Sequence, residues 1–224
     1  MLKKRYMKSK RTVLFDLDGT LTDPAVGITK SVNHALEFFD IQTEDLGTLC
    51  KFIGPPLKES FMKYYGFDEA KALLAIEKYR EYFKVQGIYE NELIEGMDIL
   101  LEKLSNDGRQ LIVATSKPEV FADIILEHFG LMNYFSHVCG SELNGTRVKK
   151  AEVIMYALDK AGISDPSSAV MVGDRKHDVI GAMEAGMDCI GVLFGYGSRE
   201  ELQDAGTALV VESVEELGAA LLGY

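Results

Sequence analysis

The chain has 224 residues and a formal net charge of −11, with 47% hydrophobic and 26% charged residues. This is the composition of an ordinary globular protein, long enough for one large core and a small second domain. The acidic balance argues against nucleic-acid binding, which needs basic patches, and no stretch reaches the length of a membrane span. We therefore expect neither nucleic acid nor a membrane as a partner.

The N-terminal segment, residues 1–11, is basic and lacks the apolar stretch of a secretory signal. We expect it to be a flexible lead-in. The three cysteines, Cys50, Cys139 and Cys189, are odd in number and far apart in the sequence. This pattern favours a reducing compartment, and we expect a cytoplasmic protein.

The first predicted strand is the apolar run Val13–Phe15, which ends in an aspartate-rich turn. Asp16 and Asp18 are two residues apart, so they leave the strand on the same side. Gly19 permits a sharp turn. Two like charges this close are tolerated when a cation binds them or when one carboxyl group is protonated. The alternative is an acidic turn that has no function.

Residues 23–92 have apolar spacings of the helical kind, as in Ile28, Val32 and Leu36, and no convincing strand. We expect a helical domain inserted after the first strand. In an open α/β sheet, ligands bind at the carboxyl ends of the strands, so an insertion there is expected to act as a lid over the site. Structural decoration is the alternative.

From residue 93 onward, helical patterns that stop at glycine alternate with β-branched runs. The predicted strands are Leu111–Ala114, a short one near His137, Ala169–Val172, Cys189–Val192 and Ala208–Val211. Such alternation predicts an α/β fold with a doubly wound parallel sheet. Residues 12–22 and 93–224 would form this core domain, and residues 23–92 a small all-α cap.

Two further strand ends carry polar residues. Thr115 and Ser116 precede a predicted helix whose first turn would hold Pro118, so their hydroxyls and free N–H groups would suit a phosphate. Asp174 leaves a later strand, and Asp178 follows it by one helical turn. With Asp16 and Asp18, four carboxylates would meet at one sheet edge, which suits Mg²⁺.

A lysine pair, Lys149 and Lys150, opens the predicted helix that carries Val153, Ile154, Ala157 and Leu158. Lysine opposes the helix dipole at this end of a helix, where Asp or Glu is preferred. Its placement suggests a role in neutralising a nucleophile and a phosphate. A surface lysine is the alternative.

In this order, the segments resemble the four motifs of the haloacid dehalogenase superfamily. Asp16-Leu17-Asp18-Gly19-Thr20 resembles its first motif, Thr115 its second, Lys150 its third, and Gly173-Asp174 with Asp178 its fourth. Lys150 is preferred to Lys149 because the family lysine precedes a helix of the Glu-Val-Ile type. The likeness extends over the chain from Thr12 and implies a helical cap on a Rossmann-like core.

The resemblance implies that Asp16 is a nucleophile that forms an aspartyl-phosphate. Asp18 would protonate the leaving oxygen and then activate water. Thr115 and Lys150 would hold the phosphoryl oxygens. The Mg²⁺ cofactor would be bound by Asp16, the backbone carbonyl of Asp18, and Asp174, with Asp178 assisting.

Several segments are similar to the phosphoglycolate phosphatase group, namely Ile53–Leu57, Thr115–Pro118 and Gly195–Ser198. Ser116 stands where that group has asparagine. The resemblance implies a phosphatase of a small phosphorylated metabolite. Hydrolysis of 5′-nucleotides or pyrophosphate, phosphosugar mutase activity, and phosphate binding without turnover are the alternatives. The sequence does not distinguish a monomer from a dimer.

Overall fold

The computed structural model describes residues 7–223. Its internal contacts divide the chain into two compact units, one made of Met1–Thr22 with Leu93–Tyr224 and the other of Asp23–Glu92. We call these the core unit and the helical unit. Strands β2 (Thr22–Asp23) and β3 (Glu92–Leu93) pair with each other where the chain passes from one unit to the other.

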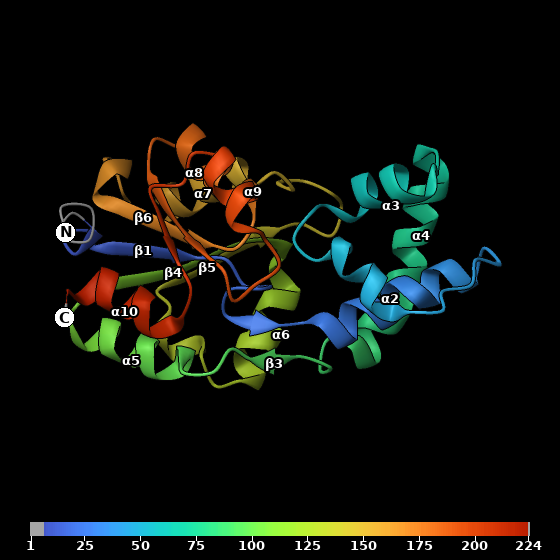
Figure 1. Ribbon diagram of the computed structural model, residues 1–224, viewed down its shortest axis with the longest axis horizontal. Coiled ribbons are helices and arrows are strands. Elements are labelled where there is room, and N and C mark those ends of the chain that lie inside the picture. The colour runs from blue at the N-terminus through green and yellow to red at the C-terminus, as the bar shows by residue number, and fades with distance from the viewer. Residues whose placement is uncertain (1–6, 224) are drawn as a thin grey trace. The chain divides into compact units, whose positions relative to one another are not determined.

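The core unit is built on a six-stranded sheet of order β5-β4-β1-β6-β7-β8. Strands β5, β4, β1 and β6 of this sheet are labelled in Figure 1. Every neighbouring pair is parallel. The strands are β1 (Thr12–Phe15), β4 (Gln110–Pro118), β5 (His137–Ser141), β6 (Ala169–Gly173), β7 (Asp188–Val192) and β8 (Leu209–Val211). The chain builds the sheet outward from β1 first on one side and then on the other. The predicted doubly wound α/β fold is confirmed.

Helices cover both faces of this sheet, with α5, α6 and α10 on one face and α7 and α8 on the other (Figure 1). The core-unit helices are α5 (Met97–Asn106), α6 (Glu119–His128), α7 (Lys150–Lys160), α8 (Lys176–Glu184), α9 (Arg199–Asp204) and α10 (Val214–Leu222), with 3-10 turns at Met132–Tyr134 and Pro166–Ser168. Because the sheet is covered on both faces, its strands are apolar throughout. Val13, Leu14 and Phe15 are fully buried.

One strand runs further than its sequence predicts. The pattern predicts a strand that ends at Ala114 and a helix that contains Pro118, but β4 continues through Pro118 and α6 begins at Glu119. The register of β4 against β5 shifts between Ala114 and Pro118. A residue that precedes proline avoids the helical conformation, which keeps Lys117 extended. Thr115 and Ser116 therefore lie on an extended segment rather than at a helix start.

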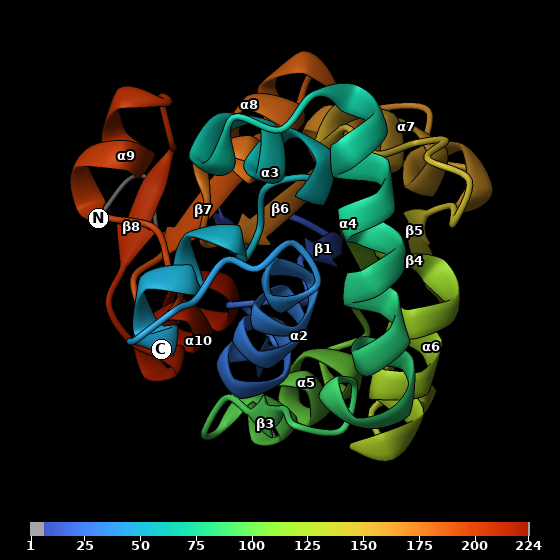
Figure 2. The same ribbon diagram turned by 90° about the vertical axis from the view of Figure 1, so that its right-hand side faces the viewer.

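The helical unit contains α2 (Ala25–Glu37), α3 (Leu57–Tyr65) and α4 (Glu69–Tyr82), with a 3-10 helix at Leu46–Phe52 and a π-helical turn at Phe83–Gly87. Helices α2 and α4 lie side by side (Figure 2). Aromatic rings fill much of its interior: Phe52 and Phe61 are 4.9 Å apart between centroids, and Phe61 stacks on Phe67 at 5.9 Å.

The expectation of a flexible lead-in over residues 1–11 is wrong for residues 7–11. Residues 1–6 lie outside the described part of the chain. Met7 is buried. The Lys10 ammonium donates to the carbonyl of Ser167 at 2.6 Å and to Asp188 Oδ2 at 2.9 Å. The basic residue at position 10 is therefore a structural anchor of the core unit.

Candidate active site

The site begins where β1 ends. Asp16 follows the last residue of β1, and its backbone N–H donates to the carbonyl of Val172 on the neighbouring strand β6. One carboxylate oxygen of Asp16 accepts from the N–H of Leu17 at 2.8 Å. Backbone groups therefore hold both the main chain and the side chain of Asp16, which is only 4% exposed.

Three carboxylates meet at this edge. Asp16, Asp174 and Asp178 are buried, and each offers an oxygen that lies within 4.8 Å of the others. Burial, with the charges of Asp178 and Asp16, raises the pKa of Asp174 well above its ordinary value. Burial also raises the pKa of Asp178 to about 6, against the opposing effect of Lys150. Such a concentration of buried carboxylates is costly without a cation.

This donor set fits a divalent metal ion. Three carboxylate oxygens within reach of one another, from the end of β1, the β6–α8 connection and the first turn of α8, are hard ligands of the kind that Mg²⁺ takes. Glycines leave room around the carboxylates. A Cβ atom at Gly173 would overlap the carboxyl group of Asp178, and one at Gly19 would overlap that of Asp174.

Lys150 supplies the positive charge. It is the first residue of α7 and only 6% exposed. Its Nζ lies 2.8 Å from Asp16 Oδ1 and 2.8 Å from Asp178 Oδ1, and it donates to the carbonyl of Ala114 at 3.1 Å. Burial alone would lower the pKa of Lys150, but the two carboxylates outweigh it and raise that pKa. Lys149 is exposed, so the lysine at this site is Lys150.

Asp18 is paired with a residue that the sequence does not single out. Lys117 Nζ lies 2.9 Å from Asp18 Oδ2, and both side chains are buried. Burial raises the pKa of Asp18, while Lys117 acts in the opposite direction. The sequence offers one signal for Lys117, its place directly after Thr115-Ser116 at a strand end.

The second residue missed as a site element is Tyr196, whose backbone N–H donates to Asp174 Oδ2 at 2.7 Å. The glycines on either side allow this approach, because a Cβ at Gly195 would overlap the Asp174 side chain and one at Gly197 the Asp174 carbonyl. The Gly-x-Gly spacing after β7 is the signal that could have identified it.

Thr115 and Ser116 lie next to these residues. Thr115 follows Ala114, whose carbonyl accepts from Lys150, and it is 2% exposed. The Thr115 hydroxyl accepts from the N–H of Lys117 at 3.2 Å. Ser116 is half-buried, and its carbonyl accepts from the hydroxyl of Ser141 at 2.8 Å. The structure thus places Thr115 at the edge of the sheet where Asp16 and Lys150 lie. The backbone carbonyl of Ser116 is occupied by its hydrogen bond with Ser141.

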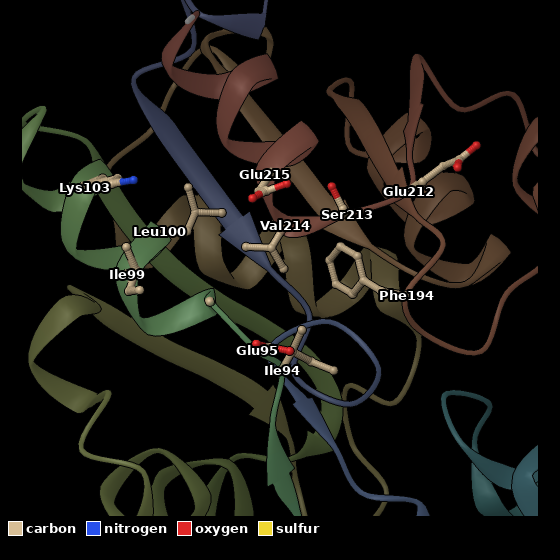
Figure 3. A pocket seen from close by; sticks show the side chains of 11 residues that line it. Ile94, Glu95, Ile99, Leu100, Lys103, Phe194, Glu212, Ser213, Val214 and Glu215 are labelled. Carbon is tan, nitrogen blue, oxygen red and sulfur yellow. The ribbon is translucent and has the colours of Figure 1, made fainter.

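A cavity of about 520 Å³ lies elsewhere in the core unit (Figure 3). Its lining includes Ile99 and Leu100 of α5, Phe194, and Val214 and Glu215 at the start of α10. None of the predicted site residues lines it.

Among residues 7–223, no helix is long and apolar enough to cross a membrane.

Comparison with known proteins identifies the family. Residues 13–192 match the model of the haloacid dehalogenase-like hydrolases. The chain is 52% identical to a predicted phosphatase from Clostridium acetobutylicum of known crystal structure, with a TM-score of 0.93 over 96% of this chain and 99% of that one. The chain belongs to the haloacid dehalogenase-like hydrolase family, as its motifs indicated.

Curated relatives differ in their named activities. A 5′-nucleotidase from Pseudomonas aeruginosa is 51% identical over 85% of this chain and 86% of its own length. The tyrosine-protein kinase PtkA of Mycobacterium tuberculosis is 38% identical over 96% of this chain and 73% of its own. A phosphoglycolate phosphatase from Agrobacterium fabrum is 29% identical over 82% of this chain and 80% of its own.

Proposed function

We propose that the protein is a Mg²⁺-dependent phosphomonoester hydrolase that acts on a small phosphorylated metabolite through an aspartyl-phosphate on Asp16. The observation that carries the proposal is the buried cluster of Asp16, Asp174 and Asp178 with Lys150 between two of the three. A nucleophilic carboxylate that must approach an anionic phosphate needs positive charge beside it.

In the first step, a carboxylate oxygen of Asp16 attacks the phosphorus atom. The bond from phosphorus to the substrate oxygen breaks, and that oxygen takes the electron pair together with a proton from Asp18. Lys150 and the Thr115 hydroxyl would stabilise the charge on the remaining phosphoryl oxygens. A bound Mg²⁺ ion, held by Asp16, the Asp18 carbonyl, Asp174 and Asp178, would supply further charge neutralisation and orientation.

In the second step, Asp18 takes a proton from a water molecule, whose oxygen attacks the phosphorus of the aspartyl-phosphate. The bond between phosphorus and the Asp16 carboxylate breaks, so that inorganic phosphate leaves and the carboxylate is regenerated. Asp18 regains its proton in this step and is ready for the next turnover.

Two substrate classes have specific support. Resemblance in three segments favours phosphoglycolate, whereas the relative of higher identity is named a 5′-nucleotidase. The helical unit is inserted in the sequence directly after the Asp16–Thr22 segment. We propose that this unit is a cap domain that selects the substrate.

We also propose that the enzyme is cytoplasmic, because its three cysteines are unpaired, as is usual in a reducing compartment.

The proposal is tested by phosphate release from a metabolite panel that includes 2-phosphoglycolate, 5′-nucleotides, pyrophosphate and hexose phosphates, with Mg²⁺ and with EDTA. We expect release that requires Mg²⁺. Activity on a hexose phosphate that needs a bisphosphate activator and frees little phosphate would select a mutase. Absence of turnover across the panel would favour a phosphate-binding protein.

The nucleophile is tested by Asp16→Asn. An amide cannot form the acyl-phosphate, so we expect at least about a 1,000-fold loss of kcat, because loss of a covalent nucleophile removes most of the rate enhancement. The variant keeps a side chain of the same shape, and its thermal unfolding should remain cooperative. Near-normal phosphatase activity in this variant would refute the aspartyl-phosphate.

A further inference from the structure

Lys117 is a buried cation beside the proposed acid and base. Its residue is 9% exposed, and its Nζ contacts Asp18 Oδ2 at 2.9 Å. Removing an ammonium group from water is costly unless a partner compensates. Lys117 lies on the extended end of β4, which runs through Pro118. Its backbone N–H donates to the Thr115 hydroxyl, which helps to hold the residue in place.

The two oxygens of the Asp18 carboxyl group have different surroundings. Oδ2 is held by Lys117, whereas Oδ1 is buried and has no hydrogen-bond partner among residues 7–223. The backbone around Asp18 is fixed, since the Gly19 N–H donates to the Thr22 carbonyl at 2.7 Å. Rotation about the side-chain bonds of Asp18 is therefore the freedom that remains, and the contact with Lys117 restricts it.

We propose that Lys117 is a positioning residue that holds Asp18 Oδ2, so that Oδ1 is the oxygen that exchanges protons with the leaving group and with water. This inference rests on the proposed function, in which Asp18 is the acid and base. A protonated carboxyl group keeps one carbonyl oxygen as an acceptor. Lys117 can therefore hold Oδ2 both before and after Oδ1 has given up its proton.

The leaving group determines which reactions depend on this arrangement. When the phosphorus–oxygen bond of an alkyl phosphate breaks, the departing oxygen must take the proton from Oδ1. The departing p-nitrophenolate of p-nitrophenyl phosphate is a stable anion and needs no proton. Loss of Lys117 should therefore slow the first step for alkyl phosphates and spare it for the aryl ester.

The experiment compares wild type, Lys117→Met and Lys117→Arg with Mg²⁺, in single turnovers of p-nitrophenyl phosphate and of an alkyl phosphomonoester, 2-phosphoglycolate or 5′-AMP, that the wild type hydrolyses. In Lys117→Met we expect a loss of about 100-fold for the alkyl ester and of no more than about threefold for the aryl ester, in line with the usual size of general acid catalysis. Lys117→Arg should recover a large part of the alkyl activity, because it retains a cation at this position.

The ratio of the two rates, measured on one preparation, does not depend on the fraction of protein that is folded. Lys103→Met, a substitution of an exposed lysine on α5, is the matched control and should leave the ratio unchanged. Equal losses for both substrates, or no loss for either, would overturn the role of Lys117. A wild type that hydrolyses neither ester with Mg²⁺ would instead overturn the proposed function itself.

Discussion

At the scale of single residues, Lys150 is held in a position that opposes ordinary helix preferences. It occupies the first position of α7, where the helix dipole disfavours a cation. Its contacts at 2.8 Å with Asp16 and Asp178 outweigh that preference. The space for its side chain comes from α8, where a Cβ at Gly181 would crowd the Lys150 side chain.

We predict that Lys150→Met lowers kcat by at least about 100-fold, the usual cost of removing one charge-stabilising donor. It should also lower the free energy of unfolding of the metal-free protein by about 3–5 kcal/mol, because two buried carboxylates lose their partner. Kinetics and denaturant unfolding measure the two effects. Lys149→Met replaces the exposed neighbour. It should keep kcat within about twofold of the wild-type value and the free energy of unfolding within about 0.5 kcal/mol. Similar losses in the two variants would contradict the assignment.

At the scale of elements, the segment after β7 supports Asp174. The N–H of Tyr196 binds the carboxylate, and Gly197 lies so close to the Asp174 carbonyl that any side chain would overlap it. The sequence predicts the strands and helices themselves, since unbroken β-branched runs and glycine stops are local patterns. It does not predict which loop crosses a given strand end, because that depends on the order of the strands in the sheet.

We predict that Gly197→Ala displaces Asp174. The Mg²⁺ concentration needed for half-maximal stabilisation should rise by about tenfold. The free energy of unfolding should fall by about 1–3 kcal/mol through overpacking. Thermal unfolding in a Mg²⁺ titration measures both. Gly162→Ala is the control: Gly162 has a φ of 68° but nothing within 4 Å of a Cβ. It should lose about 1 kcal/mol through backbone strain and keep its Mg²⁺ dependence. An unchanged Mg²⁺ dependence in Gly197→Ala would contradict this role of the segment.

At the scale of the whole molecule, the buried carboxylates link stability to pH and to Mg²⁺. The pKa of Asp178 is near 6 when folded, against 3.8 for an ordinary aspartate, and the pKa of Asp174 is also raised. Between these pH values the folded state binds more protons than the unfolded state, so the free energy of unfolding falls as pH rises. Lys150 stays charged throughout, because its pKa is raised.

We therefore predict that Mg²⁺ stabilises the protein more at pH 7.5 than at pH 5, because protons compete with the metal for the same oxygens. The difference in the Mg²⁺-induced Tm shift should be about 3 °C or more, as expected from about 1 kcal/mol in a chain of this size. Asp178→Asn should reduce this pH dependence, and Asp174 should account for what remains. Equal Tm shifts at the two pH values would refute a metal site at these carboxylates.

Hydrophobic periodicity and the residue types of short segments are enough to predict the alternation of strands and helices, the α/β class, and the carboxylates and hydroxyls at strand ends. The tertiary structure decided what depends on distance between segments. It placed Lys150 against Asp16, paired Lys117 with Asp18, extended β4 to Pro118 and anchored Lys10 beside Asp188. Charge pairing depends on the distance between side chains in space. Strand order and helix packing set that distance, and a local sequence pattern does not predict it.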